Sequence, residues 1–548
     1  MLKITLKIRK MVSITRIKMF TQPLNPTGNV GLTILASLTP IIVLLILLAG
    51  LRLSAWLASL IGSIVTILVA ILVWRTPVTQ VMNAWLIGAL VGTWAISWIV
   101  FWGLTIYNTL VLTGKFDAFK DWVIRNSTND ARIQAVLLAW SFGALLEGLV
   151  GFGYPWAFVA PLLIALGFED LKALQVSALA NNAPVSFGAL GTPIVILAAT
   201  TGLPLLFVSS SVAKVVAILA LLPPWILLYL VDRWKGIKDV WPMAIVASLA
   251  YILGQYPIAS FVGPYLPDIT GSLVSFIILL LFLRVWRPKR VLSLRQLNGG
   301  GGNDKKYTTR DVIMAWSAFI ILIIIVTLWT GPWSPLTKVS IATLEQPAFS
   351  TLLHKKVAVS FAFNPFVAGT SILVSWIVIS IVLRASPRIM GEAIKRSFMQ
   401  YWGGILTGVF VVGLAYVFNF SGMAYSLAWK TSDLGLVFII VSPLFGWLGC
   451  ALSGSNTSSN ALFGVFQVTT ARLAGLPIGL TPALNSVGAE LAKPVAPQTA
   501  SAGVSTTKYV RKEGVVIRAN LPWAIGILIY LIIIGVVYAF LAPTLFLP

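Results

Sequence analysis

The sequence predicts an all-α polytopic membrane protein with about 12–14 transmembrane helices. Of its 548 residues, 58% are hydrophobic and only 10% are charged, whereas about a quarter of the residues of a soluble domain are charged. Apolar runs of roughly 17–25 residues, the length that spans a bilayer, recur from one end of the chain to the other. Because lipid offers the backbone no hydrogen-bond partners, these runs must be helical.

Ten of the apolar runs are clear, and two further regions are interrupted by polar residues. We expect no soluble domain of any size between them. The clear runs lie near 33–51, 54–74, 84–112, 205–231, 240–260, 269–286, 313–331, 366–384, 402–420 and 520–542.

The basic residues lie in short segments between the apolar runs, which is the positive-inside pattern of cytoplasmic loops. We attribute the formal net charge of +23 to this topology and expect no nucleic-acid partner, because no single soluble face gathers the charge. The segments contain Lys3, Lys7, Arg9, Lys10, Arg16 and Lys18; Arg233, Lys235 and Lys238; Arg284, Arg287, Lys289, Arg290, Arg295, Lys305, Lys306 and Arg310; Arg384, Arg388, Lys395 and Arg396; and Lys508, Arg511, Lys512 and Arg518.

This pattern divides the chain into four parts of a multi-pass plasma-membrane protein. Residues 1–30 form a basic segment that we expect in the cytoplasm, with the N-terminus, and residues 31–286 form a first transmembrane half. A basic cytoplasmic linker at 287–312, which contains four consecutive glycines at 299–302, precedes a second transmembrane half at 313–548. A second polar loop is expected at about 332–360.

Two regions are too polar and too rich in Gly and Pro to be ordinary lipid-facing helices. The first half has broken elements near 141–193 (SFGALLEGLVGFGYP, then NNAPVSFGALGTP), and the second has them near 451–501 (ALSGSNTSSNALFG, then NSVGAELAKPVAPQTAS). Gly143 and Gly148 match Gly449 and Gly454 at one offset of 306 residues. Paired interrupted helices in two halves indicate a transporter binding site. We expect two interrupted or re-entrant regions related as an internal repeat, inverted as is usual for such folds.

Two acids, Glu147 and Glu490, fall inside the interrupted regions, far from polar flanks. An ionisable group at membrane depth costs at least about 2.5–3.5 kcal/mol and usually marks an ion or proton pathway. Burial favours the neutral form of a carboxyl, which suits a proton carrier. We therefore predict proton coupling through Glu147 and Glu490. The alternative is a structural carboxyl that caps broken backbone.

The substrate is expected to be an anion held between the two regions. Lys493 either neutralises a substrate carboxylate or pairs with Glu490 three positions earlier. Where a half-helix begins, free N–H groups and the helix dipole bind anions. The predicted substrate-binding residues are Asn181, Asn182, Ser455, Asn456, Thr457, Ser458 and Lys493. The alternative for these polar clusters is a kinked helix packed by small residues.

The chain is not expected to be an enzyme, and we expect no cofactor and no metal. A hydrolase in the bilayer needs a base or metal ligands, usually histidine. The one histidine, His354, lies in a polar loop beside two lysines, and Cys450 is the one cysteine. A channel is the other competing class, and saturable accumulation driven by a pH gradient would distinguish a carrier from it.

Long motifs in this chain resemble those of the lactate permease family. They are GALLEGLVGFGYP, NNAPVSFGALGTPI, FVGPYLPDITGSLVS (261–275), GWLGCALSGSNTSSNALFGVFQ (446–467) and the run from Asn485 to Gln498, and the likeness extends in order over nearly the whole chain. The resemblance implies secondary active transport of L-lactate, D-lactate and glycolate with protons. The alternative is a sodium-coupled or other carboxylate transporter of the same architecture. Ser455-Asn456-Thr457 is also similar to a motif at the hairpin tips of divalent-anion/sodium symporters, which implies re-entrant hairpins.

The chain departs from the lactate permease pattern at two positions. The resemblance implies an Asp at the position of Asn456 and no acid at the position of Glu490. A carboxyl has therefore moved, in this interpretation, from one broken element to the other. This leaves the coupling ion open, either a proton or sodium.

Overall fold

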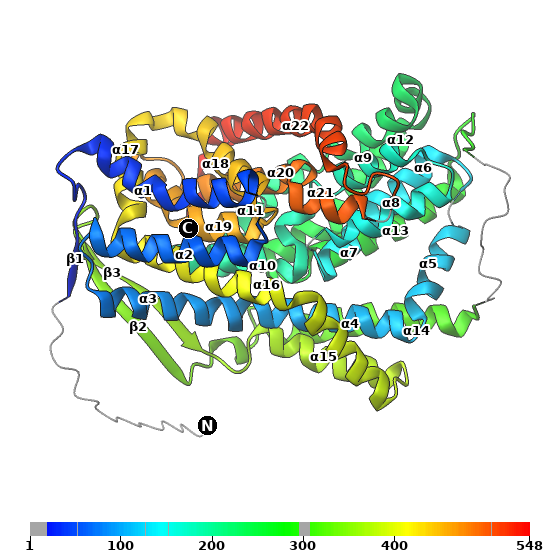
Figure 1. Ribbon diagram of the computed structural model, residues 1–548. Coiled ribbons are helices and arrows are strands. Elements are labelled where there is room, and N and C mark those ends of the chain that lie inside the picture. The colour runs from blue at the N-terminus through cyan, green and yellow to red at the C-terminus, as the bar shows by residue number, and fades with distance from the viewer. Residues whose placement is uncertain (1–18, 52, 127, 152, 295–306, 506) are drawn as a thin grey trace.

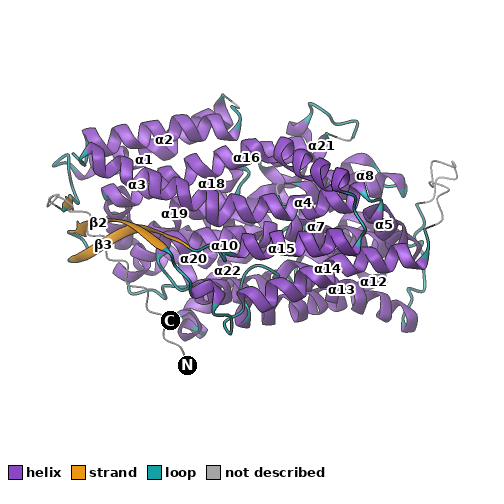
Figure 2. Ribbon diagram, turned by 90° about the horizontal axis from the view of Figure 1, so that it is seen from below, coloured by secondary structure: helices purple, strands orange, loops and turns teal. Residues whose placement is uncertain are grey.

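A computed structural model of the chain describes residues 19–51, 53–126, 128–151, 153–294, 307–505 and 507–548. The protein is a bundle of long helices with one small sheet at an end (Figure 1). Figure 2 shows the sheet beside the ends of the helices rather than between them. The glycines at 299–302 of the predicted linker lie outside the described residues.

The first half consists of helices of very different length. They are α1 (Val30–Leu45), η1 (Ile46–Gly50), α2 (Ala55–Leu72), α3 (Val78–Val91), η2 (Gly92–Ser97), α4 (Trp98–Leu112), α5 (Lys115–Asn126), α6 (Ala131–Gln134), η3 (Ala135–Phe142), α7 (Gly143–Leu149), α8 (Tyr154–Ala165), α9 (Asp170–Ala180), η4 (Val185–Phe187), α10 (Gly188–Thr201), α11 (Leu205–Leu219), α12 (Pro223–Phe261) and α13 (Pro267–Val285).

The second half repeats this mixture of long and short helices. It consists of α14 (Thr309–Thr330), η5 (Leu336–Lys338), α15 (Ala368–Val382), α16 (Pro387–Ser421), α17 (Met423–Thr431), η6 (Ser432–Val437), α18 (Phe438–Ser453), α19 (Asn456–Leu473), α20 (Leu480–Ala492), η7 (Lys493–Val495), α21 (Pro497–Val504), α22 (Glu513–Leu541) and η8 (Pro543–Phe546).

By length and composition, 10 helices in the described part of the chain can cross a membrane, or up to 11 if one bent pair forms a span. This is fewer than the expected 12–14. One reason is that the 57-residue stretch Leu205–Phe261 doubles back. Ser209 Oγ donates to the Ala259 carbonyl (2.6 Å) and Ser248 Oγ to the Leu221 carbonyl (3.4 Å), so the runs expected at 205–231 and 240–260 lie antiparallel. A second reason is that α15 is shorter than the run at 366–384.

A three-stranded sheet corrects the prediction of an all-α protein. Strand β1 (Phe20–Gln22) pairs in parallel with β2 (Ala342–Ser350), which pairs antiparallel with β3 (Lys355–Phe363). The hairpin occupies the loop expected at 332–360. The residues of β3 alternate between polar or small and apolar, which is the period of a half-buried strand, and Val357 and Val359 pack on a small buried cluster with Phe420.

The sheet bears on the two segments that are both predicted to be cytoplasmic, residues 1–30 and the linker at 287–312. The linker region and the β2–β3 hairpin are separated by the single span α14, so they lie on opposite sides of the membrane. Strand β1 is bonded to β2 and therefore lies on the side opposite the linker. The basic linker and residues 19–30 therefore cannot both be cytoplasmic, contrary to the prediction from the charge pattern. Residues 1–18 of the predicted cytoplasmic segment lie outside the described residues.

Helices that are far apart in sequence approach closely through glycine. Helices α18 and α20 pack so tightly that a Cβ on Gly446 would collide with the backbone of Asn485, and one on Gly488 with the backbone of Pro443. Small residues at such contacts are how membrane helices gain packing energy. The contact fixes the broken segment after α20 against the tip of the α18–α19 hairpin.

Candidate functional site

Four breaks in helical structure meet in the middle of the bundle. Helix α7 ends before a loop at 150–153, α9 and α10 are separated by residues 181–187, α18 turns into α19 at Gly454, and α20 is separated from α21 by η7 and Ala496. At this break, the segment Val185–Thr201 is bent by 64° relative to helix α9. The interrupted regions predicted near 141–193 and 451–501 are therefore where the helices break.

The start of α10 is strained. Ala189 and Leu190 have φ values of 45° and 55°, the left-handed region that residues with a Cβ avoid, and Gly191 follows at 73°. Each such non-glycine residue costs of order 1–3 kcal/mol, and strain of this kind gathers at functional sites. Just before them, Gly188 packs on the carboxylate of Glu147 so closely that a Cβ would have no room. The strained turn thus holds backbone directly against a buried acid.

Glu147 and Lys493 form a buried ion pair that joins the two halves of the chain. Lys493 Nζ lies 2.7 Å from Glu147 Oε1, and the Glu147 side chain is 1% exposed. Asn181 Nδ2 donates to the other carboxylate oxygen, Oε2, at 2.8 Å. Glu147 comes from α7, Asn181 from the break after α9 and Lys493 from η7, so three of the four breaks contribute to this cluster.

The structure separates Lys493 from the partner that sequence spacing offered. Glu490 Oε2 accepts the backbone N–H of Ser186 at 2.8 Å, and no ion pair within the described residues joins Glu490 to a cation. Three residues further along, Lys493 is the first residue of η7, so its side chain leaves the face of α20 that carries Glu490. The pairing of Lys493 with Glu490 is therefore wrong.

Ser186 links the two positions where the chain departs from the family pattern. Its backbone binds Glu490, and its hydroxyl lies 3.5 Å from Asn456 Nδ2 and 3.2 Å from Ser486 Oγ. Asn456 of α19 and Glu490 of α20 thus both contact Ser186. Each keeps one oxygen buried without a hydrogen-bond partner, Asn456 Oδ1 and Glu490 Oε1.

The turn between α18 and α19 closes over the ion pair. Gly454 has φ of 67°, which suits glycine, and Ser455 caps α19 by accepting the N–H of Ser458 at 3.1 Å. A cavity of about 20 Å³ lies between this turn and the pair. It is lined by Glu147, Gly151, Val185, Gly188, Ala189, Thr192, Pro193, Gly454, Ser455, Asn456, Thr457 and Lys493. This volume holds about one water molecule, so no larger molecule fits the cavity in this arrangement.

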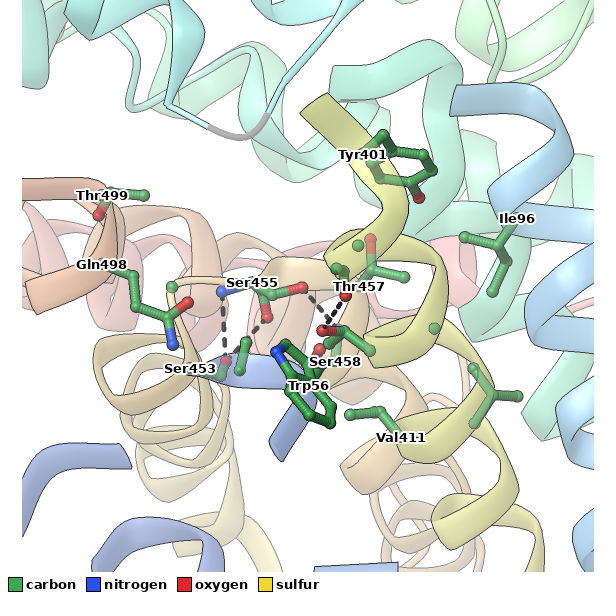
Figure 3. Close-up of a pocket in the computed structure, with 17 residues that line it drawn as sticks. Trp56, Ile96, Tyr401, Val411, Ser453, Ser455, Thr457, Ser458, Gln498 and Thr499 are labelled. Carbon is green, nitrogen blue, oxygen red and sulfur yellow. Dashed lines mark hydrogen bonds between the residues drawn. The ribbon is translucent and has the colours of Figure 1, made fainter. Parts of the chain in front are cut away.

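A larger cavity lies on the other side of the same turn. Its volume is about 330 Å³, and it shares Gly454, Ser455 and Thr457 with the small cavity. Figure 3 shows the hydroxyls of Ser453, Ser455, Thr457 and Ser458 gathered at its floor, with Trp56 beside them and Gln498 across from them. Small-molecule sites typically have about 300–1,000 Å³. The residues of this turn therefore line both cavities, the larger one and the small one beside the Glu147–Lys493 pair.

The predicted substrate residues are only partly brought together. Ser455, Asn456, Thr457 and Lys493 line the small cavity, whereas Ser458 lines the larger one. Asn181 acts on Glu147 and is not among the lining residues. Asn182 is fully buried with both side-chain polar atoms unpartnered, and it lines neither cavity.

Sequence reasoning missed a third acid at depth, Asp268. Its side chain is 1% exposed and one oxygen accepts the hydroxyl of Tyr251 at 2.9 Å, while Oδ2 has no partner. It packs on Gly148, the residue after Glu147. Asp268 opens α13, so its position resembled a loop acid, although the apolar residues on both sides of it were a signal of burial.

A buried charge network at the linker end of the bundle was also missed. Arg132 is fully buried and contacts Asp130 (2.6 Å), Asp239 (3.0 Å) and Asp232 (3.2 Å). The half-exposed Arg290 bonds both Asp232 and Asp239. The network ties the turn between the two arms of α12 to the start of α6. No group of three or more His, Cys, Asp or Glu side chains within the described residues is arranged to hold a metal ion.

The sequence is similar to those of known permeases over nearly its whole length. A profile described as L-lactate permease matches residues 33–545. The chain is 35% identical to the glycolate permease GlcA of Escherichia coli, covering 94% of this chain and 97% of that one. It is 32% identical to the L-lactate permease of Bacillus subtilis (94% and 97%) and 31% identical to that of Salmonella typhimurium (95% and 97%).

The solved structure of the YdaH transporter of Alcanivorax borkumensis aligns with 85% of this chain and 88% of its own, at 15% identity and a TM-score of 0.45. The sequence relationships decide the classification, because the family profile covers nearly the whole chain. This multi-pass membrane protein is a transporter rather than an enzyme, and it belongs to the L-lactate permease family.

Proposed function

We propose that the protein carries L-lactate and related small 2-hydroxy monocarboxylates, including D-lactate and glycolate, across the plasma membrane with protons. The single observation that carries this proposal is the buried Glu147–Lys493 ion pair on the wall of the small cavity. The names of the relatives, glycolate permease and L-lactate permease, supply the substrate class.

The carboxylate of the substrate binds Lys493 and the first turn of α19. A helix start leaves N–H groups without intrahelical partners, and the dipole there favours an anion. Ser455, Asn456 and Thr457 lie at that start, on the same cavity as Lys493. Their hydroxyl and amide groups bind the substrate's own hydroxyl, which distinguishes a 2-hydroxy acid from a simple carboxylate. Asn181 and Asn182 belong to the supporting break rather than to the first contacts.

In this proposal, proton coupling follows because Glu147 and the substrate carboxylate compete for Lys493. Protonation of Glu147 removes the partner of Lys493, and an unpaired buried charge costs about 3–5 kcal/mol. The substrate carboxylate restores the pair, so a proton and an anion enter together and the charge of the site is unchanged. Release of the proton returns Glu147 to Lys493 and expels the substrate.

Two further acids support a proton rather than sodium as the coupling ion. Neither Glu490 nor Asp268 has an ion-pair partner within the described residues. A carboxyl that is buried without a cation is most stable as the neutral acid. The second candidate is sodium coupling. It is favoured by Asn456 Oδ1, a buried oxygen without a partner next to broken backbone, because hard cations bind such oxygens.

The four breaks form two related pairs in this proposal. The α7–α8 turn with the α9–α10 break corresponds to the α18–α19 turn with the α20–α21 break, as an inverted repeat of the halves 31–286 and 313–548. The linker 287–312 lies in the cytoplasm. Movement of the hairpin tips relative to their surroundings opens the small cavity to one side and then to the other.

Uptake of labelled L-lactate into proteoliposomes tests the proposal. An inwardly directed proton gradient, with equal sodium on both sides, should drive accumulation that a protonophore abolishes. A sodium gradient at uniform pH should drive none. Uptake that follows sodium and ignores pH overturns proton coupling, and the absence of saturable uptake of any 2-hydroxy acid overturns the substrate class.

A further inference from the structure

A third cavity, at the opposite end of α19 from the ion pair, carries a concentration of positive charge. It has a volume of about 330 Å³ and lies between β3 and the ends of α10, α16 and α19. Three cations line it, namely Lys355, Lys356 and Arg472, and no acid does. All three are exposed, and none forms an ion pair within the described part of the chain.

The rest of the lining supplies neutral hydrogen-bonding groups. Thr200, Thr201, Asn419 and Thr469 line the cavity with Tyr416 and Tyr425. Consecutive residues of β3, from Lys355 to Ser360, also line it. Strand β3 is bonded to β2 on one side and is an edge of the sheet. The nearest acid on the sheet, Glu345, pairs with Ser360 at the end of this stretch.

The cavity lies on the side of the membrane opposite the basic linker. The β2–β3 hairpin follows α14, and this helix is one span away from the linker. With the linker in the cytoplasm, the cavity faces the outside. Lys and Arg are depleted in external loops by the positive-inside rule, so three unpaired cations around an external cavity run against the topology of the chain.

Two helices lead from this cavity to the ion pair. Helix α19 begins at the substrate cavity with Asn456, and its last turn brings Arg472 to the basic cavity, about 24 Å away along the helix. Helix α10 likewise begins beside Glu147 and ends with Thr200 and Thr201. The two helices pack closely, because Gly464 of α19 has no room for a Cβ against Leu197 and Thr200 of α10.

We propose that this basic cavity is an outer vestibule, a weak capture site that concentrates small carboxylate anions before they reach the Glu147–Lys493 site. The inference rests on the proposed function as a carboxylate carrier. Fixed positive charge at the mouth of a pathway raises the local concentration of anions and their rate of entry. The cluster acts at long range, so it needs no specific contact with the 2-hydroxy group.

Neutralising the cluster tests the capture role. Lys355→Gln/Lys356→Gln/Arg472→Gln should raise the KM for external lactate about three- to tenfold near 0.01 M ionic strength, with kcat unchanged. The difference should shrink near 0.15 M, where the screening length falls to about 8 Å. The KM for internal lactate, measured by efflux, should not change. The matched control, Lys235→Gln/Lys238→Gln/Arg388→Gln, removes the same charge from the opposite side and should leave the external KM unchanged.

A transport-independent measurement reports on the cavity itself. In a Cys450→Ser background, a cysteine replacing the exposed Ala358 should react faster with an anionic methanethiosulfonate than with a cationic one. The triple neutralisation should lower that rate ratio about tenfold. Equal rates for the two reagents overturn the vestibule. Anion preference with no change in external KM overturns its capture role, and absence of lactate uptake by the unaltered protein overturns the proposed function instead.

Discussion

Lys493 Nζ lies 2.7 Å from Glu147 Oε1, although the two residues are 346 positions apart in the chain. The pair sits where three helix breaks meet, and it borders a cavity too small for a substrate. A buried pair of this kind contributes little net stability, because desolvation offsets the Coulomb attraction. In the proposed function, Glu147 instead serves as an internal anion that the substrate carboxylate replaces beside Lys493.

Glu147→Gln imitates the protonated acid and frees Lys493 permanently. We expect lactate exchange between equal concentrations to survive, whereas accumulation against a gradient is lost. Lactate binding should also lose its dependence on pH, since the competing carboxylate is gone. Isothermal titration calorimetry at pH 6 and pH 8 measures lactate binding, and counterflow in proteoliposomes measures exchange. Equal loss of exchange and accumulation would indicate a structural role for Glu147.

Lys493→Met leaves the Glu147 carboxylate buried without its cation. We expect this change to destabilise the detergent-solubilised protein by about 3–5 kcal/mol, measured as the shift of its thermal unfolding transition. Glu147→Gln/Lys493→Met should recover most of that loss, because neither charge remains. Uptake should be absent in both variants. If the double variant is as unstable as Lys493→Met, the two residues are not coupled in the way the geometry indicates.

Asn456 and Glu490 flank Ser186 and provide a test of the migrated carboxyl. Glu490→Gln should impair proton-driven uptake, and adding Asn456→Asp should restore part of it, because the acid returns to the same neighbourhood from α19. Uptake is compared at equal protein level, with substrate binding measured beside it. Simple addition of two defects would show that the sites are independent.

Cysteines at the α18–α19 turn should report the substrate. In a Cys450→Ser background, Ser455→Cys and Thr457→Cys should be protected from a thiol reagent by lactate, since both residues line the small cavity. Ser340→Cys, on the exposed approach to β2, serves as the unprotected control. A variant that still transports, and whose turn cysteines react equally with and without lactate, would exclude this placement of the substrate.

Arg132 and Arg290 share the same carboxylates but differ in burial. Arg132→Ala leaves Asp130 buried without its cation and should lower the stability by about 3–5 kcal/mol. Arg290→Ala, at a side chain that is 45% exposed, should lower the stability much less, because water screens an exposed ion pair. Thermal unfolding of the two variants gives the comparison. Equal effects would mean that the network is not organised around Arg132.

The sequence by itself determined the membrane location, the interrupted regions and two of the three deep acids. Each of these follows from properties of short segments, namely apolar length, Gly and Pro content and the cost of a charge in lipid. The same local patterns misjudged two features. The strand period of β3 was hidden in a segment that was polar on average, and residues 20–22 were expected on the linker's side although they pair with β2 beyond the opposite end of α14.

The tertiary structure decided which charges meet. Spacing along one helix offered Glu490 as the partner of Lys493, but helix α20 ends at Ala492 and the lysine turns toward α7 instead. Asp268 became a neighbour of Glu147 only because α13 packs on Gly148. The basic cavity likewise gathers Lys355 and Lys356 with Arg472, which lies more than a hundred positions further along the chain. Such contacts depend on helix packing and on where each helix stops, and these are set by the whole bundle rather than by any one segment.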